Sequence, residues 1–381
     1  MENKEALDLL VQSVNIDTTL GNEKQLANLL EQVFKKQGFR TKQIEYAEGR
    51  SGLIATIEGK ESGPVLTYSG HLDVVPVGEV SWETDPFSAT EIDGKLFGRG
   101  TCDMKGGLIA LIAGVFRFLS KDTDFKGVIK FAITMGEETS SIGAQQLLEL
   151  GEIDDIDAMI IAEPTSLSVG IAHKGALWPE ITFYGQTAHG SMPHKGVNAI
   201  KQAIKAVEVI DSHFDFTKEQ DEAVGHSTSS LNILQGGNGT NVVPDKCVVR
   251  YDIRTIASQE HEKIKQEFHD VLNRLAEDDE TFNFEIKFIN DLPAMKTSSD
   301  DPFVHLVVEA VKATTDYEGE INNPAYYTDA SIFTQAEKNF PIIIIGPGIA
   351  EMAHQPNEFV EIDKFYDMIS IVAYITEHYF K

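Results

Sequence analysis

Six residues stand out because each follows a short apolar run or opens an apolar helix, and all carry carboxylate or imidazole groups. They are His71 in "YSGHLDVVP", Asp103 in "GRGTCDMKGG", Glu137 and Glu138 in "MGEETSS", Glu163 in "IIAEPTS" and His354 in "AEMAHQPNE". In open α/β sheets, ligands collect at the carboxyl ends of the strands. Imidazole and carboxylate groups that converge there without a thiolate are typical of a site for one or two divalent ions such as Zn, Co or Mn.

The spacing of Asp73 and His71 strengthens this interpretation. Residues i and i+2 of a strand point to the same face. The spacing therefore predicts that the Asp73 carboxylate accepts the second N–H of a metal-bound His71 imidazole, which would fix the tautomer of the ring.

The elements that must position these residues alternate between helices and strands. Apolar residues at helical spacing predict helices over 5–18, 24–37, 104–119 and 141–150. Short apolar runs bounded by glycine and proline predict strands over 52–59, 64–78, 127–134 and 157–165. This alternation indicates an α/β fold whose mixed, mostly parallel sheet is flanked by helices.

The pattern changes near residue 176. From there to about residue 290, the order strand, helix, strand, strand, helix, strand resembles the split βαβ motif of a ferredoxin-like α+β domain. The α/β pattern then resumes up to a final helix near 362–380. We therefore expect a discontinuous catalytic domain, 1–175 and 291–381, with an inserted domain at 176–290.

The composition excludes several classes of partner. The 381 residues carry a formal net charge of -28, which repels nucleic acid and anionic membrane surfaces. The two cysteines, Cys102 and Cys247, form no metal-binding or disulfide pattern. With no signal peptide or long apolar stretch, the sequence predicts a soluble cytoplasmic protein.

The motifs together resemble those of the M20 metallopeptidase and deacylase family. The segments that carry the resemblance, in the order and spacing of the family, are "GHLDVVP", "GRGTCDMKGG", "MGEETSSIGA", "AEPTS", "TAHGSMPHKGVNAI", "GGNGTNVVP" and "AHQPNE". The resemblance runs through essentially the whole chain. It implies a zinc-peptidase-like catalytic domain and a lid and dimerisation role for the inserted domain.

The resemblance also implies a role for each of the six residues. His71 and Glu163 would bind one metal ion, Glu138 and His354 would bind the other, and Asp103 would bridge the two. Glu137 would be the general base, with Asp73 orienting His71. The ions would be zinc, with cobalt or manganese as alternatives, and the Asp103–Met104 peptide bond would be cis.

Four further residues match family positions near the substrate. His189 would reach the active site of a partner subunit and donate to the oxyanion, which implies a homodimer through the inserted domain; a local loop contact is the alternative. Asn241, Arg254 and Thr328 would contact the substrate. For Arg254, a surface ion pair is an equally good interpretation.

The expected reaction is hydrolysis of an N-acyl amino acid amide, first of all release of succinate from N-succinyl-LL-diaminopimelate in lysine biosynthesis. The segments "HKGA" (173–176) and "YYTDAS" (326–331) depart from the desuccinylase pattern. Deacetylation of N-acetylornithine and aminoacylase or dipeptidase activity therefore stay open. A non-catalytic binder of acyl amino acids or peptides is the alternative from a different class.

Overall fold

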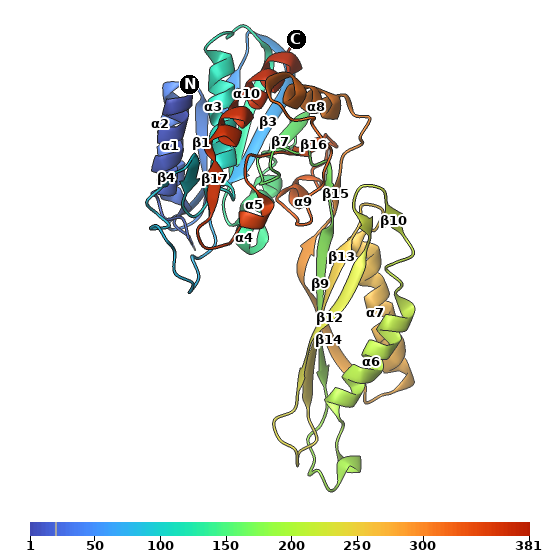
Figure 1. Cartoon of the computed structure of the whole chain (residues 1–381). Helices are drawn as coiled ribbons and strands as arrows, with labels where there is room; N and C mark the ends of the chain where they lie inside the picture. Colours follow the sequence, from blue (N-terminus) through green and yellow to red (C-terminus); the bar gives the residue numbers. More distant parts are fainter. Residues whose placement is uncertain (20) are drawn as a thin grey trace. The chain divides into compact units, whose positions relative to one another are not determined.

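The chain is described by a computed structural model over residues 1–19 and 21–381 (Figure 1). It divides into two compact units. The first comprises Met1–Ala172 and Lys296–Lys381, and the second comprises His173–Met295. The second unit is thus inserted in the sequence of the first.

The first unit is built around a six-stranded sheet with the order β1-β2-β6-β3-β7-β16. The strands are β1 (Arg40–Ala47), β2 (Arg50–Glu58), β3 (Glu61–His71), β6 (Lys126–Thr134), β7 (Ala158–Ile161) and β16 (Ile342–Ile344). β6, β3, β7 and β16 run parallel, whereas β2 pairs antiparallel with both β1 and β6. The predicted mixed, mostly parallel sheet is confirmed.

Helices flank this sheet (Figure 1). They are α1 (Asn3–Val14), α2 (Glu23–Lys36), α3 (Lys105–Leu119), α4 (Glu137–Ser140), α5 (Ile142–Glu149), α8 (Pro302–Thr314), α9 (Ala330–Phe333) and α10 (Ile362–Tyr379). All residues of α3 except Arg117 are buried, and the helix packs against β3 and α10. A Cβ on Gly107 of α3 would lie 2.0 Å from the Ala162 carbonyl oxygen, so glycine lets this helix approach the end of β7.

Short elements complete the first unit. β4 (Thr90–Ile92), β5 (Lys95–Phe97) and β17 (Phe359–Glu361) form a three-stranded sheet, and η2 (Ala350–Met352) is a 3-10 turn. At the two points where the sequence passes between the units, β8 (Ala172–His173) pairs with β15 (Met295–Lys296). Within the described residues, none of the helices is long and apolar enough to cross a membrane.

The second unit is a four-stranded antiparallel sheet with two helices. The sheet order is β12-β13-β9-β14, formed by β9 (Gly175–Tyr184), β12 (Thr228–Gly236), β13 (Lys246–Thr255) and β14 (Asn283–Leu292). α6 (Ala199–His213) and α7 (His261–Asp278) pack on it through a core that includes Phe183 and Phe268. The remaining short elements are η1 (Pro193–Lys195), β10 (Gln220–Asp221) and β11 (Gly225–His226).

Candidate metal centre

The five predicted ligands and Glu137 belong to the first unit, and four of these six side chains follow the carboxyl ends of adjacent strands. His71 is the last residue of β3, Glu137 and Glu138 open α4 directly after β6, and Glu163 follows β7. Parallel strands that are neighbours in a sheet bring such residues to one edge. Their convergence therefore follows from the strand order β6-β3-β7.

Asp103 lies between two imidazoles. Its Oδ1 atom is 3.3 Å from Nε2 of His71, and its Oδ2 atom is 3.4 Å from Nε2 of His354. Asp103 precedes α3, and the Asp103–Met104 peptide bond is cis. Each oxygen of one carboxylate thus faces a different imidazole, as a bridging ligand of two ions requires.

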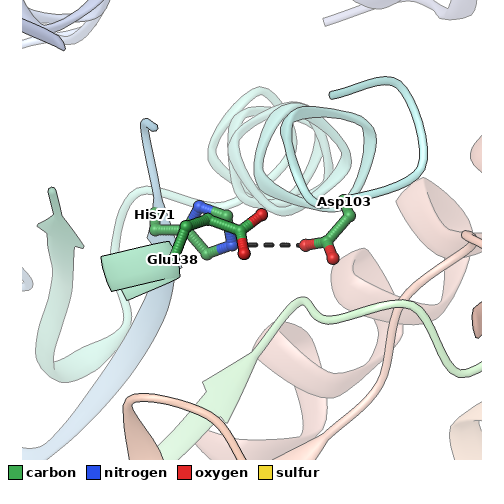
Figure 2. Close-up of side chains that lie close together, drawn as sticks. All are labelled: His71, Asp103 and Glu138. Carbon is green, nitrogen blue, oxygen red and sulfur yellow. Dashed lines mark hydrogen bonds and ion pairs between the residues drawn. The ribbon is translucent and has the colours of Figure 1, made fainter. Parts of the chain in front are cut away.

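Each imidazole has a second carboxylate beside it. Nε2 of His354 lies 3.0 Å from both oxygens of Glu138, and Nε2 of His71 lies 3.9 Å from Oε1 of Glu163. Figure 2 shows that His71, Asp103 and Glu138 point toward one another. Ligand atoms of these three residues all lie within 4.8 Å of one another.

The electrostatics of the cluster fit a divalent cation. Burial, and then repulsion from Glu163, raise the pKa of Glu137 well above its usual range. Burial, and then repulsion from Asp103, do the same to the pKa of Glu163. Carboxylates that raise the pKa of one another in a buried site are stabilised in their ionised form by a bound cation. The oxygen and nitrogen donors are those that zinc and similar ions prefer.

Glu137 and Glu138 have different surroundings although they are adjacent. Gly136, at φ 68°, turns the chain out of β6 so that both glutamates fall in the first turn of α4. Successive side chains of a helical turn point about 100° apart. Glu138 lies against His354, whereas Glu137 is 9% exposed and takes no part in that contact.

The contact between Asp73 and His71 differs from the prediction. Nδ1 of His71 lies 3.0 Å from the backbone carbonyl oxygen of Asp73, whereas the nearest carboxylate oxygen is 3.6 Å away, too far for a hydrogen bond. β3 ends at His71, so the i, i+2 rule of a continuing strand does not apply. The Asp73 carboxylate instead accepts the backbone N–H groups of Glu137 at 3.2 Å and Glu138 at 3.1 Å.

Two buried charged residues beside the cluster were missed by the sequence analysis. Arg99 is 1% exposed and Glu358 is completely buried. Nη1 of Arg99 lies 2.5 Å from Oε2 of Glu358. Glu358 Oε1 accepts the backbone N–H of Asp103 at 3.0 Å. Both residues lie inside motifs that carry the family resemblance, Arg99 in "GRGTCDMKGG" and Glu358 in "AHQPNE". Each is a charged residue without an assigned role in its motif, and this was the sequence signal that could have indicated them.

His189 and Asn241 belong to the second unit, where they are neighbours. The N–H of Gly190 donates to the Asn241 carbonyl oxygen at 2.7 Å, and both side chains are exposed. The backbone N–H of Ser191 donates to Nδ1 of His189 at 3.2 Å. Nδ1 of His189 also lies 2.8 Å from Oγ of Ser191, and Nε2 takes part in neither of these two contacts.

Arg254 and Thr328, the other two residues expected to contact the substrate, make hydrogen bonds within the chain. Arg254 donates from Nε and Nη2 to the two oxygens of Asp252 at 2.8 and 3.0 Å, the ion pair that the sequence analysis left open. Thr328, the third residue expected to contact the substrate, is fully buried. Its hydroxyl accepts the N–H of Ala330 at 3.1 Å, which is a local contact at the start of α9.

Comparisons with known proteins identify the family of the chain. The family described as peptidase family M20/M25/M40 matches residues 67–378. A probable succinyl-diaminopimelate desuccinylase of Staphylococcus aureus is 31% identical and covers 99% of this chain and 98% of its own. An acetylornithine deacetylase of Shigella sonnei is also 31% identical, over 93% of this chain and 90% of its own.

A solved structure supports the fold. A dinuclear metal-binding peptidase of the M20 family from Bacillus subtilis superimposes with a TM-score of 0.74 at 16% identity. The match covers 99% of this chain and 98% of that one. The chain therefore resembles that peptidase in fold.

Proposed function

The chain belongs to peptidase family M20/M25/M40, whose members are dinuclear metal enzymes, and we propose that it hydrolyses N-acyl amino acids at its own two-metal centre. The family and its named relatives make it an amidohydrolase. The observation that carries the proposed site is Asp103, whose two carboxylate oxygens face His71 and His354 separately. A carboxylate shared in this way fits two ions better than one.

We assign the ligands from the two halves of the cluster. His71 and Glu163 would hold one ion, and His354 and Glu138 the other, with Asp103 common to both. Zinc suits this donor set, and cobalt or manganese are alternatives. Such ions polarise the scissile carbonyl and lower the pKa of bound water when present.

Glu137 is the proposed general base. It lies beside Glu138 without sharing the His354 contact, so its carboxylate stays separate from that pair. In hydrolysis, its carboxylate would take a proton from the attacking water and return it to the leaving amine nitrogen. The products are then a free acid and an amino acid with a free amine.

His189 is the proposed donor to the oxyanion, from a partner subunit. Its Nδ1 is engaged by Ser191, so Nε2 is the ring nitrogen that we propose as the donor. A homodimer through the second unit is supported by β12, an edge strand that is exposed along its whole length. β12 carries the exposed apolar residues Leu231, Ile233 and Leu234, and such an edge pairs readily with another strand.

N-succinyl-LL-diaminopimelate is the first proposed substrate, and lysine biosynthesis the proposed role. This choice rests on the Staphylococcus aureus relative, while the Shigella sonnei relative, of the same 31% identity over a smaller share of both chains, is named an acetylornithine deacetylase. N-acetylornithine is therefore the second candidate, with aminoacylase or dipeptidase substrates next. Cys102 and Cys247 are free and buried, which fits the proposed cytoplasmic location.

A substrate panel tests the reaction and the metal together. Metal-free protein is loaded separately with Zn, Co or Mn and given N-succinyl-LL-diaminopimelate, N-acetylornithine, other N-acyl amino acids and dipeptides. We expect release of a free amine from at least one N-acyl amino acid, and none from the Glu137→Gln control. Protein that binds metal without cleaving any of these compounds would favour the non-catalytic binder.

A further inference from the structure

Glu358 holds the loop that carries Asp103. Its side chain is completely buried, and its Oε1 atom accepts three backbone N–H groups from a single turn of chain. They belong to Gly100 at 3.0 Å, Cys102 at 2.8 Å and Asp103 at 3.0 Å. Gly100 has a φ of 86°, a conformation open to glycine, and it lets these groups converge on one oxygen. The position of the Asp103 backbone thus depends on one carboxylate.

Arg99 extends this contact to two further segments. Beside its 2.5 Å ion pair with Glu358, its guanidinium donates to the carbonyl oxygens of Gln355 at 3.3 Å and Pro76 at 3.3 Å. A longer contact of 3.5 Å reaches the carbonyl oxygen of His354. The guanidinium also lies 5.0 Å from the ring centroid of Trp82. One side chain therefore bonds to the segment after β3 and to the loop of His354.

The pair joins segments that have little regular structure of their own. Asp103 lies in a turn before α3, and His354 lies in a turn after η2 with a φ of 64°. Neither ligand is held in place by a strand. Between them, Arg99 and Glu358 bond to both turns, so the distance between the two ligands depends on this pair.

We propose that Arg99 and Glu358 are positioning residues that hold Asp103 and His354 at the separation two metal ions require. The inference rests on the proposed metal centre. A buried ion pair by itself is weak evidence for stability, because apolar residues often replace one without loss. The pair is suited to positioning, since a guanidinium carries five N–H donors in a planar, fixed fork, whereas a lysine has three donors on a single nitrogen.

Metal binding by two variants tests the inference. Glu358→Gln keeps an acceptor oxygen but leaves Arg99 without its counter-charge, and Arg99→Lys keeps the charge but loses the fork. The matched control is Thr376→Val, which removes a buried 2.6 Å contact with Tyr68 in the core of the same unit. Chelator competition measures the affinity for each Zn²⁺ ion, the visible spectrum of Co²⁺-loaded protein reports the ligand geometry, and urea unfolding of metal-free protein reports stability.

We expect both variants to bind at least one ion roughly tenfold or more weakly than the wild type, with a changed Co²⁺ spectrum. Thr376→Val should lose stability but keep wild-type affinity and spectrum. If Glu358→Gln does not fold, the measurements on Arg99→Lys test the inference. If the variants keep the wild-type affinity and spectrum, the positioning role is overturned but the proposed metal centre is not. Wild-type protein that binds no metal would instead contradict the proposed function.

Discussion

Oδ2 of Asp73 accepts the backbone N–H of Glu138 at 3.1 Å, so the residue beside the His71 ring also fixes the start of the helical turn that carries both glutamates. Its other oxygen takes the N–H of Glu137 at 3.2 Å. The carboxylate therefore connects the end of β3 to the turn after β6. This connection positions the proposed ligands His71 and Glu138 relative to each other.

Replacing Asp73 should weaken metal binding through this connection. Asp73→Asn keeps one acceptor oxygen, whereas Asp73→Ala keeps none, so we expect the alanine variant to lose more. Replacing a residue that hydrogen-bonds to a metal ligand typically lowers the metal affinity about 10–100-fold. Chelator competition with Zn²⁺ measures the loss. Equal affinities in Asp73→Ala and the wild type would show that the backbone carbonyl of Asp73 alone suffices.

Glu137→Gln should separate chemistry from metal binding. The amide cannot accept a proton, so we expect turnover to fall by roughly 10²–10⁴-fold while both ions stay bound. Glu138→Gln is the matched control on the adjacent residue, and it should lose one ion. Elemental analysis after gel filtration, beside the rate of amine release, gives both readouts. Equal metal loss in the two variants would mean that the two roles are wrongly assigned.

Mixed dimers test whether His189 acts in a partner subunit. We expect His189→Ala to lower the rate by about 10²–10³-fold, the range for one oxyanion donor, without releasing metal. When His189→Ala and Glu137→Gln subunits are mixed, a histidine acting in the partner leaves one complete site in each mixed dimer. Activity then returns on mixing. A histidine acting in its own subunit leaves no complete site, and the mixture stays inactive.

A lysine on β12 should break the proposed homodimer. Leu234 is 45% exposed on this edge strand, and charged residues on an edge oppose pairing with another strand. We expect Leu234→Lys to be monomeric in light scattering. Ile289→Lys is the matched control, because Ile289 is 48% exposed on β14, the opposite edge of the sheet. A change of mass in the control alone would place the interface on β14.

His173 should make the protein acid-sensitive. Burial lowers the pKa of His173 to about 4, from 6.5, so the folded chain binds this proton less readily than the unfolded chain. The contribution of His173 to the free energy of unfolding therefore falls as the pH drops from about 6.5 to about 4. The loss is about 3 kcal/mol at most. In His173→Asn this part of the loss should be absent. Urea unfolding at pH 7.5 and 4.5, with chelator present, compares the two proteins. Equal pH dependence would contradict this assignment.

Much of the convergence of the candidate site could be predicted from the sequence because its proposed ligands follow strand ends. His71, Glu138 and Glu163 are each marked by an apolar run, and parallel strands bring such ends together. The role of the Asp73 carboxylate could not be predicted in this way, because it depends on where β3 stops. A carboxylate two residues beyond a strand end no longer follows the alternation of side chains.

Arg99 and Glu358 illustrate a second limit. They lie 259 positions apart in sequence, and only the folded chain shows that their charges meet. Thr328 illustrates a third, because its burial depends on packing around α9 that no local pattern reports. Local patterns therefore predicted which segments converge, while the contacts between loops needed the structure.

The insertion of the second unit has a consequence for how the protein is made. His354 and α10, which covers the apolar helix α3, belong to the segment that follows the inserted unit. During synthesis, the ribosome therefore completes the inserted unit before the nascent first unit can acquire its last proposed metal ligand or cover α3. A chain truncated before residue 296 would expose α3 and lack His354. It is expected to require chaperones and to be removed by proteolysis.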